Sequence, residues 1–285
     1  MKLVIIAVCF LFINNCFCKF HHIKHYNVHH NKKQITKRLL NSTQIAIEKA
    51  PFMAVVEADK SFPNSHPFST AVIISNLFLL STSEFFSLQQ GKEMRAYIGL
   101  SNINLAKPDD IYEVENVTIK LPRNDSYSSG IALIRLKKEI AFNYRHRPIA
   151  LFAMNEVIMD QITEFTLMGY GYSQRNRENS LGILSRKTMR LNTRDIELSN
   201  AYFSISTNLQ MCPGDQGDPL IVKNKLIGFA IYPNSCDANS QNLTIFTGVK
   251  RLYNWIKLTV GKKNFTQAIK RAYPKTSSNL FLHFT

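Results

Sequence analysis

The chain lacks low-complexity tracts, internal repeats and long apolar runs. It has 285 residues, of which 45% are hydrophobic and 19% charged, and no acidic or Gln/Ser-rich tract interrupts them. This composition is typical of a globular protein rather than a disordered one, and no self-similarity at a solenoid or propeller period is visible. After the first eighteen residues, no segment is apolar for the roughly 20 residues that a membrane-spanning helix needs. These absences favour a globular protein with one large core or two moderate ones.

Cysteine is also scarce. Three of the five cysteines lie within MKLVIIAVCFLFINNCFC, residues 1–18, which has one lysine, a short apolar run and then small and polar residues. This order is typical of a secretory signal peptide, cleaved near Cys16 or Cys18. Only Cys212 and Cys236 remain, an even pair suited to one disulfide in an oxidising compartment. We therefore expect a secreted, extracellular protein.

Five N-x-S/T sequons agree with passage through the secretory pathway. In a secreted chain each is a candidate glycan site and is expected to mark an exposed loop or edge. The asparagines are Asn41, Asn116, Asn124, Asn242 and Asn264.

Residues 19–38 lack acidic residues altogether. They hold five histidines and six basic residues without an amphipathic period, which favours a solvated basic pro-segment without a fixed fold. A histidine-rich tail that binds zinc or copper is the alternative, but it lacks fixed ligand spacing and supporting carboxylates. We therefore expect no metal site and no cofactor.

From residue 51 the chain consists of short β-branched and aromatic runs at moderate spacing. This pattern predicts an all-β fold, and about a dozen strands over this length suit two small barrels better than one. The stretch PLIVKNKLIGFAIY predicts a hairpin that turns at Lys223, Asn224 and Lys225. One clear helix is predicted near residues 249–260, where Leu252, Trp255, Ile256 and Val260 recur at helical spacing.

Six stretches, taken together, resemble the trypsin/chymotrypsin family from about residue 38 to 260. In chain order they are TAVIISNLFLLSTSEFF, GIALIRL, LMGYGYS, MCPGDQGDPLIV, GFAIYPNSC and TIFTGVKRLYNWI. The resemblance implies two six-stranded antiparallel barrels followed by a C-terminal helix. It divides the chain into a signal peptide (1–18), the basic pro-segment (19–38), a trypsin-like domain (39–261) and a basic extension (262–285).

The family's chemistry requires a serine nucleophile, a histidine that carries its proton and an aspartate that orients the histidine. At the positions that match these three residues, the chain has Gln216, Glu84 and Gly130 respectively. The resemblance therefore implies a vestigial triad and no catalytic residues. The neighbouring hydroxyls of Ser81, Thr82 and Ser83 are interpreted as structural, since they lie at the strand end that packs under the family's histidine.

Other residues of the cleft depart from the family's pattern too. Asp218 replaces a glycine of a tight turn, and Pro233 replaces a glycine that leaves the specificity pocket open. Further departures occur at the cleft strand, the pocket floor and the cysteines that brace the histidine loop, namely Tyr232, Gln210, Ser69 and Phe85.

Some features of the family are kept. Gly214 and Asp215 remain, and the resemblance implies that Cys212 pairs with Cys236. In active relatives the aspartate pairs with a new N-terminus freed by proteolysis. Cleavage after Lys37-Arg38 would supply one here, but the sequon at Asn41 would obstruct its burial, so an uncleaved resting state is slightly favoured over cleavage.

Acidic residues are absent from residue 241 onward, and the whole chain has a formal charge of +15. A basic helix and tail could bind sulfated polysaccharide, anionic lipid or acidic protein. No base-reading motif is visible, so nucleic acid is not expected as a partner. The candidate anion-binding residues are Lys250, Arg251, Lys257, Lys262, Lys263, Lys270 and Arg271.

Three functions remain open at this stage. The favoured one is a non-catalytic protease homologue that binds a protease, inhibitor or receptor and regulates an extracellular pathway, as arthropod-type inactive homologues do by analogy. The second is a surface-binding protein that acts through the basic C-terminal region. The third is an enzyme with unfamiliar chemistry that uses Glu84 or the histidine-rich segment.

Overall fold

The structure is a computed structural model of the 285-residue chain. It describes residues 42–58, 68–121, 130–152, 162–171, 181–192, 196–198, 202–206, 215–231, 243–261 and 265. All of them lie in the second of the two units into which the chain divides, Thr36–Thr285. The predicted signal peptide, the predicted pro-segment and nearly all of the predicted basic extension lie outside the described residues. In the described part, no helix has the length and apolar character needed to cross a membrane.

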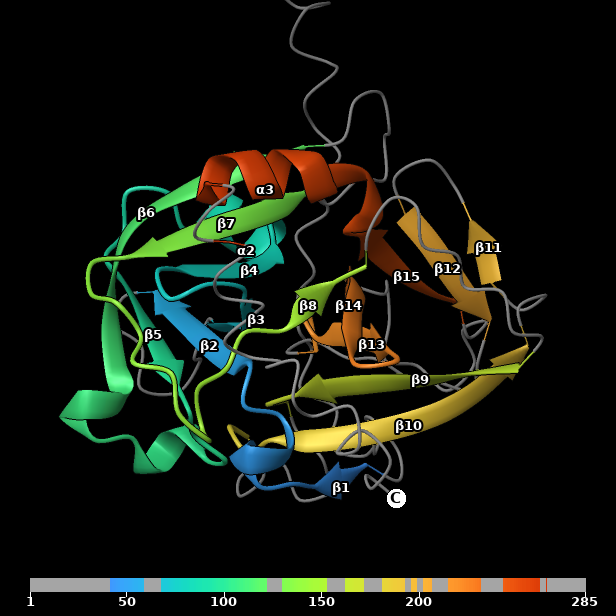
Figure 1. The fold of residues 1–285 in the computed structure, drawn as a ribbon, viewed down its shortest axis with the longest axis horizontal. Coiled ribbons are helices and arrows are strands. Elements are labelled where there is room, and N and C mark those ends of the chain that lie inside the picture. The colour runs from blue at the N-terminus through green and yellow to red at the C-terminus, as the bar shows by residue number, and fades with distance from the viewer. Residues whose placement is uncertain are drawn as a thin grey trace, which may run out of the picture. The chain divides into compact units, whose positions relative to one another are not determined.

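A closed, six-stranded antiparallel barrel forms the first half of the described domain (Figure 1). The strands occur around the barrel in the order β2, β3, β4, β7, β6 and β5. Their bounds are Met53–Ala58 (β2), Phe68–Ile73 (β3), Phe78–Thr82 (β4), Ile131–Leu136 (β7), Ile111–Lys120 (β6) and Met94–Ile98 (β5).

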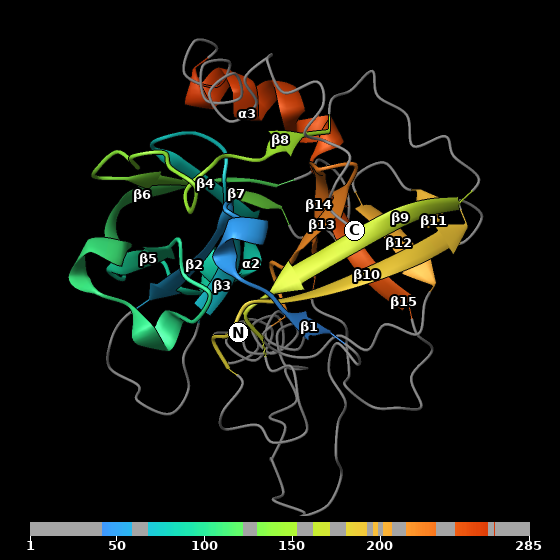
Figure 2. The same ribbon diagram turned by 60° about the horizontal axis from the view of Figure 1, so that its bottom comes forward.

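A nine-stranded sheet forms the second half, seen from another side in Figure 2. Its path runs β1, β10, β9, β13, β14, β15, β12 and β11, and β8 pairs in parallel with β14. The bounds are Thr43–Gln44 (β1), Ser185–Asn192 (β10), Ile162–Gly169 (β9), Pro219–Val222 (β13), Lys225–Ala230 (β14), Leu243–Gly248 (β15), Tyr202–Ser206 (β12), Ile196–Leu198 (β11) and Ala150–Leu151 (β8). The predicted all-β class is confirmed, with one closed barrel and a second sheet. Among the described strands, the path of the second sheet is open.

Alternation along the strands divides the core into three layers. In β2, Ala54 and Val56 point into the barrel, whereas Met53 and Val55 belong to the layer shared with the second sheet. This division follows from the two-residue period of a strand, which sends successive side chains to opposite faces. A third cluster of buried side chains, around Phe165, belongs to the second sheet. Because the middle layer takes residues from both halves, the barrel and the second sheet pack against each other.

The predicted hairpin is confirmed. Val222 pairs with Lys225, so the turn consists of two residues, Lys223 and Asn224, and Lys225 already belongs to β14. Both turn residues have positive φ, at 49° and 60°. This geometry is typical of a type I′ turn, which matches the right-handed twist of the strands that it joins.

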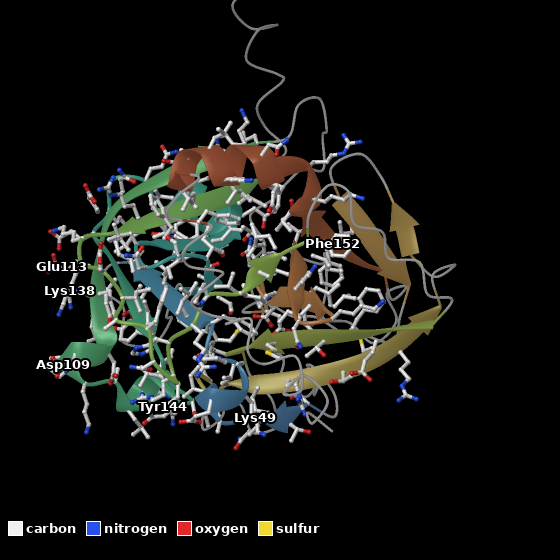
Figure 3. All side chains as sticks on the ribbon, viewed as in Figure 1. Lys49, Asp109, Glu113, Lys138, Tyr144 and Phe152 are labelled. Carbon is white, nitrogen blue, oxygen red and sulfur yellow. The ribbon has the colours of Figure 1, made fainter. Side chains whose placement is uncertain are left out.

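The predicted C-terminal helix is also present, as α3 (Tyr253–Val260). Ile256 and Val260 are buried in the middle layer, and the Phe265 ring lies edge-on to Tyr253 with 5.9 Å between centroids. The other short helices are α2 (Glu84–Leu88), η2 (Ile47–Lys49), η3 (Ile103–Leu105), η4 (Pro108–Asp110) and η7 (Lys250–Leu252). Charged side chains such as Lys49, Asp109 and Lys138 project outward from these elements and from the connecting loops (Figure 3).

Candidate functional site

Two of the three vestigial positions meet in space. Glu84 begins α2 at the end of β4, and Gln216 lies in the turn that precedes β13. The side-chain Nε2 of Gln216 donates a hydrogen bond to Oε2 of Glu84, although 132 residues separate them in the sequence. The structure therefore brings these two positions together at one site.

The third vestigial position lies beside the other two. The backbone N–H of Ser83, the residue before Glu84, donates to the carbonyl oxygen of Gly130 over 3.0 Å. A Cβ atom added at Gly130 would lie 2.3 Å from the carbonyl oxygen of Lys120, which is far inside van der Waals contact. The backbone around Gly130 therefore leaves no room for an aspartate.

Ser81, one of the hydroxyl residues that lead into this site, makes structural contacts. Ser81 is buried, and its Oγ donates to the carbonyl oxygen of Thr70 over 2.6 Å. The Oγ of Ser69 lies 3.0 Å from that of Ser81. Ser69 and Phe85 stand where the family has a bracing disulfide, and Phe85 packs edge-on against Phe86 with 5.0 Å between ring centroids. A hydrogen bond and an aromatic contact therefore occupy these positions.

Asp218 places a carboxylate in the interior of the domain. Its side chain is fully buried, and Oδ1 accepts a hydrogen bond of 2.8 Å from the hydroxyl of Thr70, on β3 of the barrel. A Cβ atom added at Gly169, on β9 of the second sheet, would lie 2.1 Å from Oδ2. The Asp218 carboxylate is thus enclosed by both halves of the domain, and the sequence did not predict this position for the new charge.

The backbone around Asp218 keeps a tight turn. Its N–H donates to the carbonyl oxygen of Asp215 over 3.1 Å, and its carbonyl oxygen accepts from Ala230 over 2.9 Å. Asp218 does not have a positive φ, so the aspartate adopts a backbone conformation that is ordinary for a residue with a side chain. Asp215, kept from the family's pattern, is likewise buried.

Tyr170 makes a second polar contact between the two halves. It follows β9, is almost completely buried, and donates its hydroxyl to the carbonyl oxygen of Leu100 over 2.8 Å. Burial raises the pKa of the Tyr170 hydroxyl strongly, because the phenolate would lose its hydration. The hydroxyl therefore stays protonated and acts as a donor.

The basic C-terminal region is only partly within the described residues. Lys250 lies in η7 with its Nζ 5.9 Å from the centroid of the Phe152 ring, which Figure 3 shows close to β8. Arg251 is exposed and Lys257 is half-buried. The other candidate anion-binding residues, Lys262, Lys263, Lys270 and Arg271, lie outside the described residues.

Several further predicted residues also lie outside. Among the sequons only Asn116 is described, and it is exposed on β6 as expected. The disulfide pair, the other sequons and the remaining cleft residues fall on undescribed positions: Cys212, Cys236, Asn41, Asn124, Asn242, Asn264, Gln210, Gly214, Tyr232 and Pro233.

Sequence reasoning missed two residues of the site. Thr70 and Gly169 contact the Asp218 carboxylate, but 148 residues separate Thr70 from it and no local pattern connects them. The one available signal was the buried-strand pattern around Thr70, in which a polar residue that lacks water requires a hydrogen-bond partner.

Comparisons with known proteins agree with this architecture. The family model described as Trypsin matches residues 40–256. Kallikrein-8 of Rattus norvegicus is 20% identical over 248 residues, which cover 79% of this chain and 94% of that protein. Two solved structures, the scabies mite inactivated protease paralogue S-I1 and the protein GrC, each superpose with a TM-score of 0.61 at 19% identity. Each alignment covers 78% of this chain and 99% of the other. At this identity the two structures show a shared fold.

Proposed function

Because the chain belongs to the trypsin family, we propose that it is a secreted, catalytically inactive protease homologue that acts by binding a protein partner. The partner is a protease, an inhibitor or a receptor of an extracellular pathway. The observation that carries the proposal is the hydrogen bond from Gln216 to Glu84 at the position of the family's nucleophile and base.

The chemistry of this pair supports inactivity. An amide nitrogen of glutamine is neither nucleophilic nor titratable, so Gln216 cannot attack a carbonyl carbon. A carboxylate can accept a proton, but the group within reach of Glu84 is an amide donor with no nucleophilic oxygen behind it. Gly130 adds no group that could orient or stabilise a charged base. Without these groups, binding and oxyanion contacts alone would supply the residual rate, some thousand-fold over water.

The fold around the pair supports a continued binding role. The barrel, the second sheet and the helix of the family are all present, and polar contacts from Thr70 and Tyr170 connect the two halves. A relative of the same fold carries the description inactivated protease paralogue. A stable surface without turnover is suited to competing with, or tethering, an active protease.

The first test is chemical. We expect the purified full chain to resist labelling by a fluorophosphonate, which reacts with activated serines, and to leave peptide esters intact. Active trypsin in the same buffer serves as the positive control, and heat-treated chain as the blank. Saturable labelling, or turnover that disappears in Glu84→Gln, would contradict the proposal and favour unfamiliar enzyme chemistry.

The second test addresses the partner. The full chain is immobilised and exposed to its native fluid, then washed at physiological and at high salt, and bound proteins are identified by mass spectrometry. A protease or inhibitor that survives the high-salt wash supports regulation by binding. Complete elution at moderate salt favours the alternative, in which the basic C-terminal region binds anionic polysaccharide or another anionic surface, because salt screens exposed charges.

A further inference from the structure

The longest strand of the barrel is paired on only one side over most of its length. β6 has ten residues, but β5 pairs with just the first three of them, Ile111 to Glu113. On its other side, β7 pairs with β6 from Val114 to Lys120. Among the described strands, the β6 edge from Val114 to Lys120 that faces away from β7 therefore has no neighbour. Such an edge presents backbone N–H and C=O groups that can pair with another strand.

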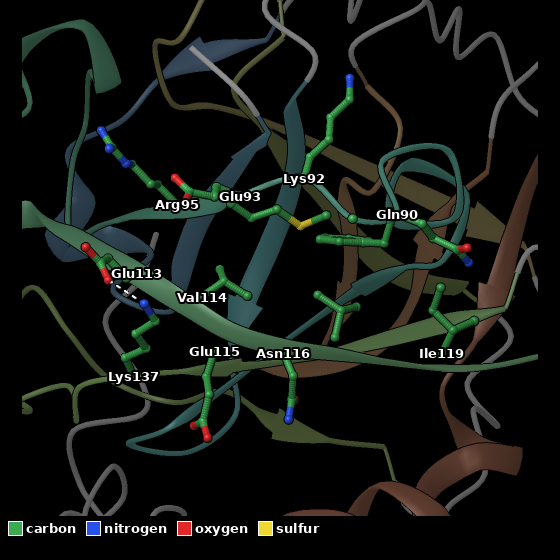
Figure 4. Close-up of a pocket in the computed structure, with 14 residues that line it drawn as sticks. Gln90, Lys92, Glu93, Arg95, Glu113, Val114, Glu115, Asn116, Ile119 and Lys137 are labelled. Carbon is green, nitrogen blue, oxygen red and sulfur yellow. Dashed lines mark hydrogen bonds and ion pairs between the residues drawn. The ribbon is translucent and has the colours of Figure 1, made fainter.

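A groove follows this edge. It has a volume of about 730 Å³ and lies between β6 and residues 90–95, which run from the turn after α2 into β5. Figure 4 shows Val114 and Ile119 on the side of β6 that faces the opposite bank, which carries Gln90 and Lys92. We call this feature the β6 groove. Its apolar lining consists of Phe86, Met94, Val114, Val117 and Ile119.

These apolar side chains reach the groove from the inside of the barrel. Met94, Val114, Val117 and Ile119 are each partly exposed and pack against the barrel core. The pairing of β6 with β7 has an irregularity in register between Val114 and Asn116. Because of this extra residue, both Val114 and Val117 face the barrel interior although three positions separate them. The groove thus combines an unpaired backbone edge with an apolar floor, the two features by which proteins bind an added strand.

The charges of the groove favour an acidic occupant. On the β6 side, Glu113 accepts from Lys137 over 2.8 Å, and Glu115 lies 2.7 Å from the guanidinium of Arg135. These pairs neutralise the carboxylates of that bank. On the opposite bank, Lys92 and Arg95 flank one acid, Glu93, and Arg95 also faces Glu113 across the β5–β6 pairing. Counting Arg135, four basic and three acidic side chains meet at the groove, a net charge of +1.

Asn116, the asparagine of the sequon on β6, lies at the rim of the groove. In Figure 4, Asn116 and Glu115 point away from the bank that carries Gln90 and Lys92. A glycan on Asn116 would therefore extend away from that bank.

We propose that the β6 groove binds an extended segment of a partner protein, which adds as a strand to the free edge of β6. The segment has apolar residues at alternate positions, which enter the groove, and acidic residues opposite Lys92 and Arg95. Backbone hydrogen bonds supply affinity, and the alternate side chains supply specificity. The proposal does not depend on whether the vestigial site is inactive.

The test selects peptides directly. A phage library of random twelve-residue peptides is selected on the full chain and counter-selected on the double variant Lys92→Glu/Arg95→Glu. The enriched peptides are synthesised, and hydrogen exchange measured by mass spectrometry maps the amides that they protect. A copy of each peptide with N-methylated backbone at alternate positions keeps the side chains but cannot pair as a strand. Lys138→Glu, an exposed charge reversal outside the groove, is the matched control variant.

We expect enriched peptides with apolar residues at every second position and at least one acid. They should slow exchange of the amides between residues 114 and 120 at least tenfold and leave β2 unchanged. N-methylation should abolish binding, Lys92→Glu/Arg95→Glu should weaken it about tenfold, and Lys138→Glu should leave it unchanged. The proposal is overturned by a selection without enrichment, by protection elsewhere, or by peptides that tolerate N-methylation. Protection of residues 114–120 by a second copy of the chain, seen as a concentration-dependent dimer, would also overturn it.

Discussion

The hydrogen bond between Thr70 and Asp218 allows a quantitative prediction about how the two halves are held together. Replacing Thr70 by valine keeps the shape of a fully buried side chain but removes the hydroxyl that lies 2.8 Å from the carboxylate. A buried acceptor that loses its hydrogen-bond donor keeps its desolvation cost, which is about 1–3 kcal/mol. We therefore expect Thr70→Val to lower the free energy of unfolding by about 1–3 kcal/mol.

The assay is thermal and urea unfolding of the full chain, followed by circular dichroism. For a domain of this size, about 1 kcal/mol shifts the melting temperature by about 2–4 °C, so the expected decrease is about 2–12 °C. Thr188→Val, an exposed position on β10, is the matched control and should change stability by less than about 0.5 kcal/mol.

A double-mutant cycle isolates the pair from other effects of the substitutions. Thr70→Val, Asp218→Ala and the double variant should yield a coupling energy of about 1–3 kcal/mol, because the hydroxyl matters only while the carboxylate is present. A coupling energy near zero, or a Thr70→Val protein that unfolds like the wild type, would refute the reasoning.

Four further predictions concern other residues of the described domain. Restoring Glu84→His and Gln216→Ser should leave ester hydrolysis about 10⁴-fold below that of a complete triad, since an orienting aspartate is missing. Adding Gly130→Asp should lower the melting temperature without restoring the rate, because its Cβ would collide with a backbone carbonyl; a full recovery of steady-state rate would contradict this. Tyr170→Phe should cost about 1 kcal/mol in urea unfolding. Burial raises the pKa of Tyr170, so the tyrosine of the unfolded chain releases its proton at lower pH than that of the folded chain. The stability of the wild type should therefore fall above about pH 10, and Tyr170→Phe should not show this fall. His146 lies half-buried in the segment between β7 and β8, and burial lowers the pKa of its ring, so the folded state favours the neutral ring. Stability should therefore fall as the pH drops below about 6.5, and His146→Gln should flatten the dependence measured by urea midpoints between pH 7 and 5.

The sequence predicted the elements of the fold better than their pairing. Alternating apolar residues indicated strands, and Lys223 and Asn224 marked a hairpin, because these signals are local. The nine-stranded path of the second sheet and the parallel pairing of β8 with β14 join residues far apart in the chain. No spacing rule specifies such pairs, since register depends on which faces become buried together.

For the site, the motifs placed Gln216 and Glu84 together, as the structure shows, because the family's order of segments carries long-range information. The motifs did not predict that the side chain of Asp218 is buried. A turn residue ordinarily faces water, and only the packing of β3 and β9 around it shows that the carboxylate is buried.

The enclosure of Asp218 also constrains the order in which this sequence could have changed. A hydroxyl at residue 70 is neutral and can be accommodated first, whereas a carboxylate at residue 218 that arrived alone would have been buried without that donor. Once the hydroxyl and the carboxylate are both present, losing either one leaves the other buried without its hydrogen-bond partner, which lowers stability. The carboxylate also leaves no space for a side chain at Gly169. The effect of a substitution at any one of the three positions therefore depends on the residues at the other two. Relatives that carry the acidic residue should also carry a small hydroxyl donor and a glycine at the two partner positions.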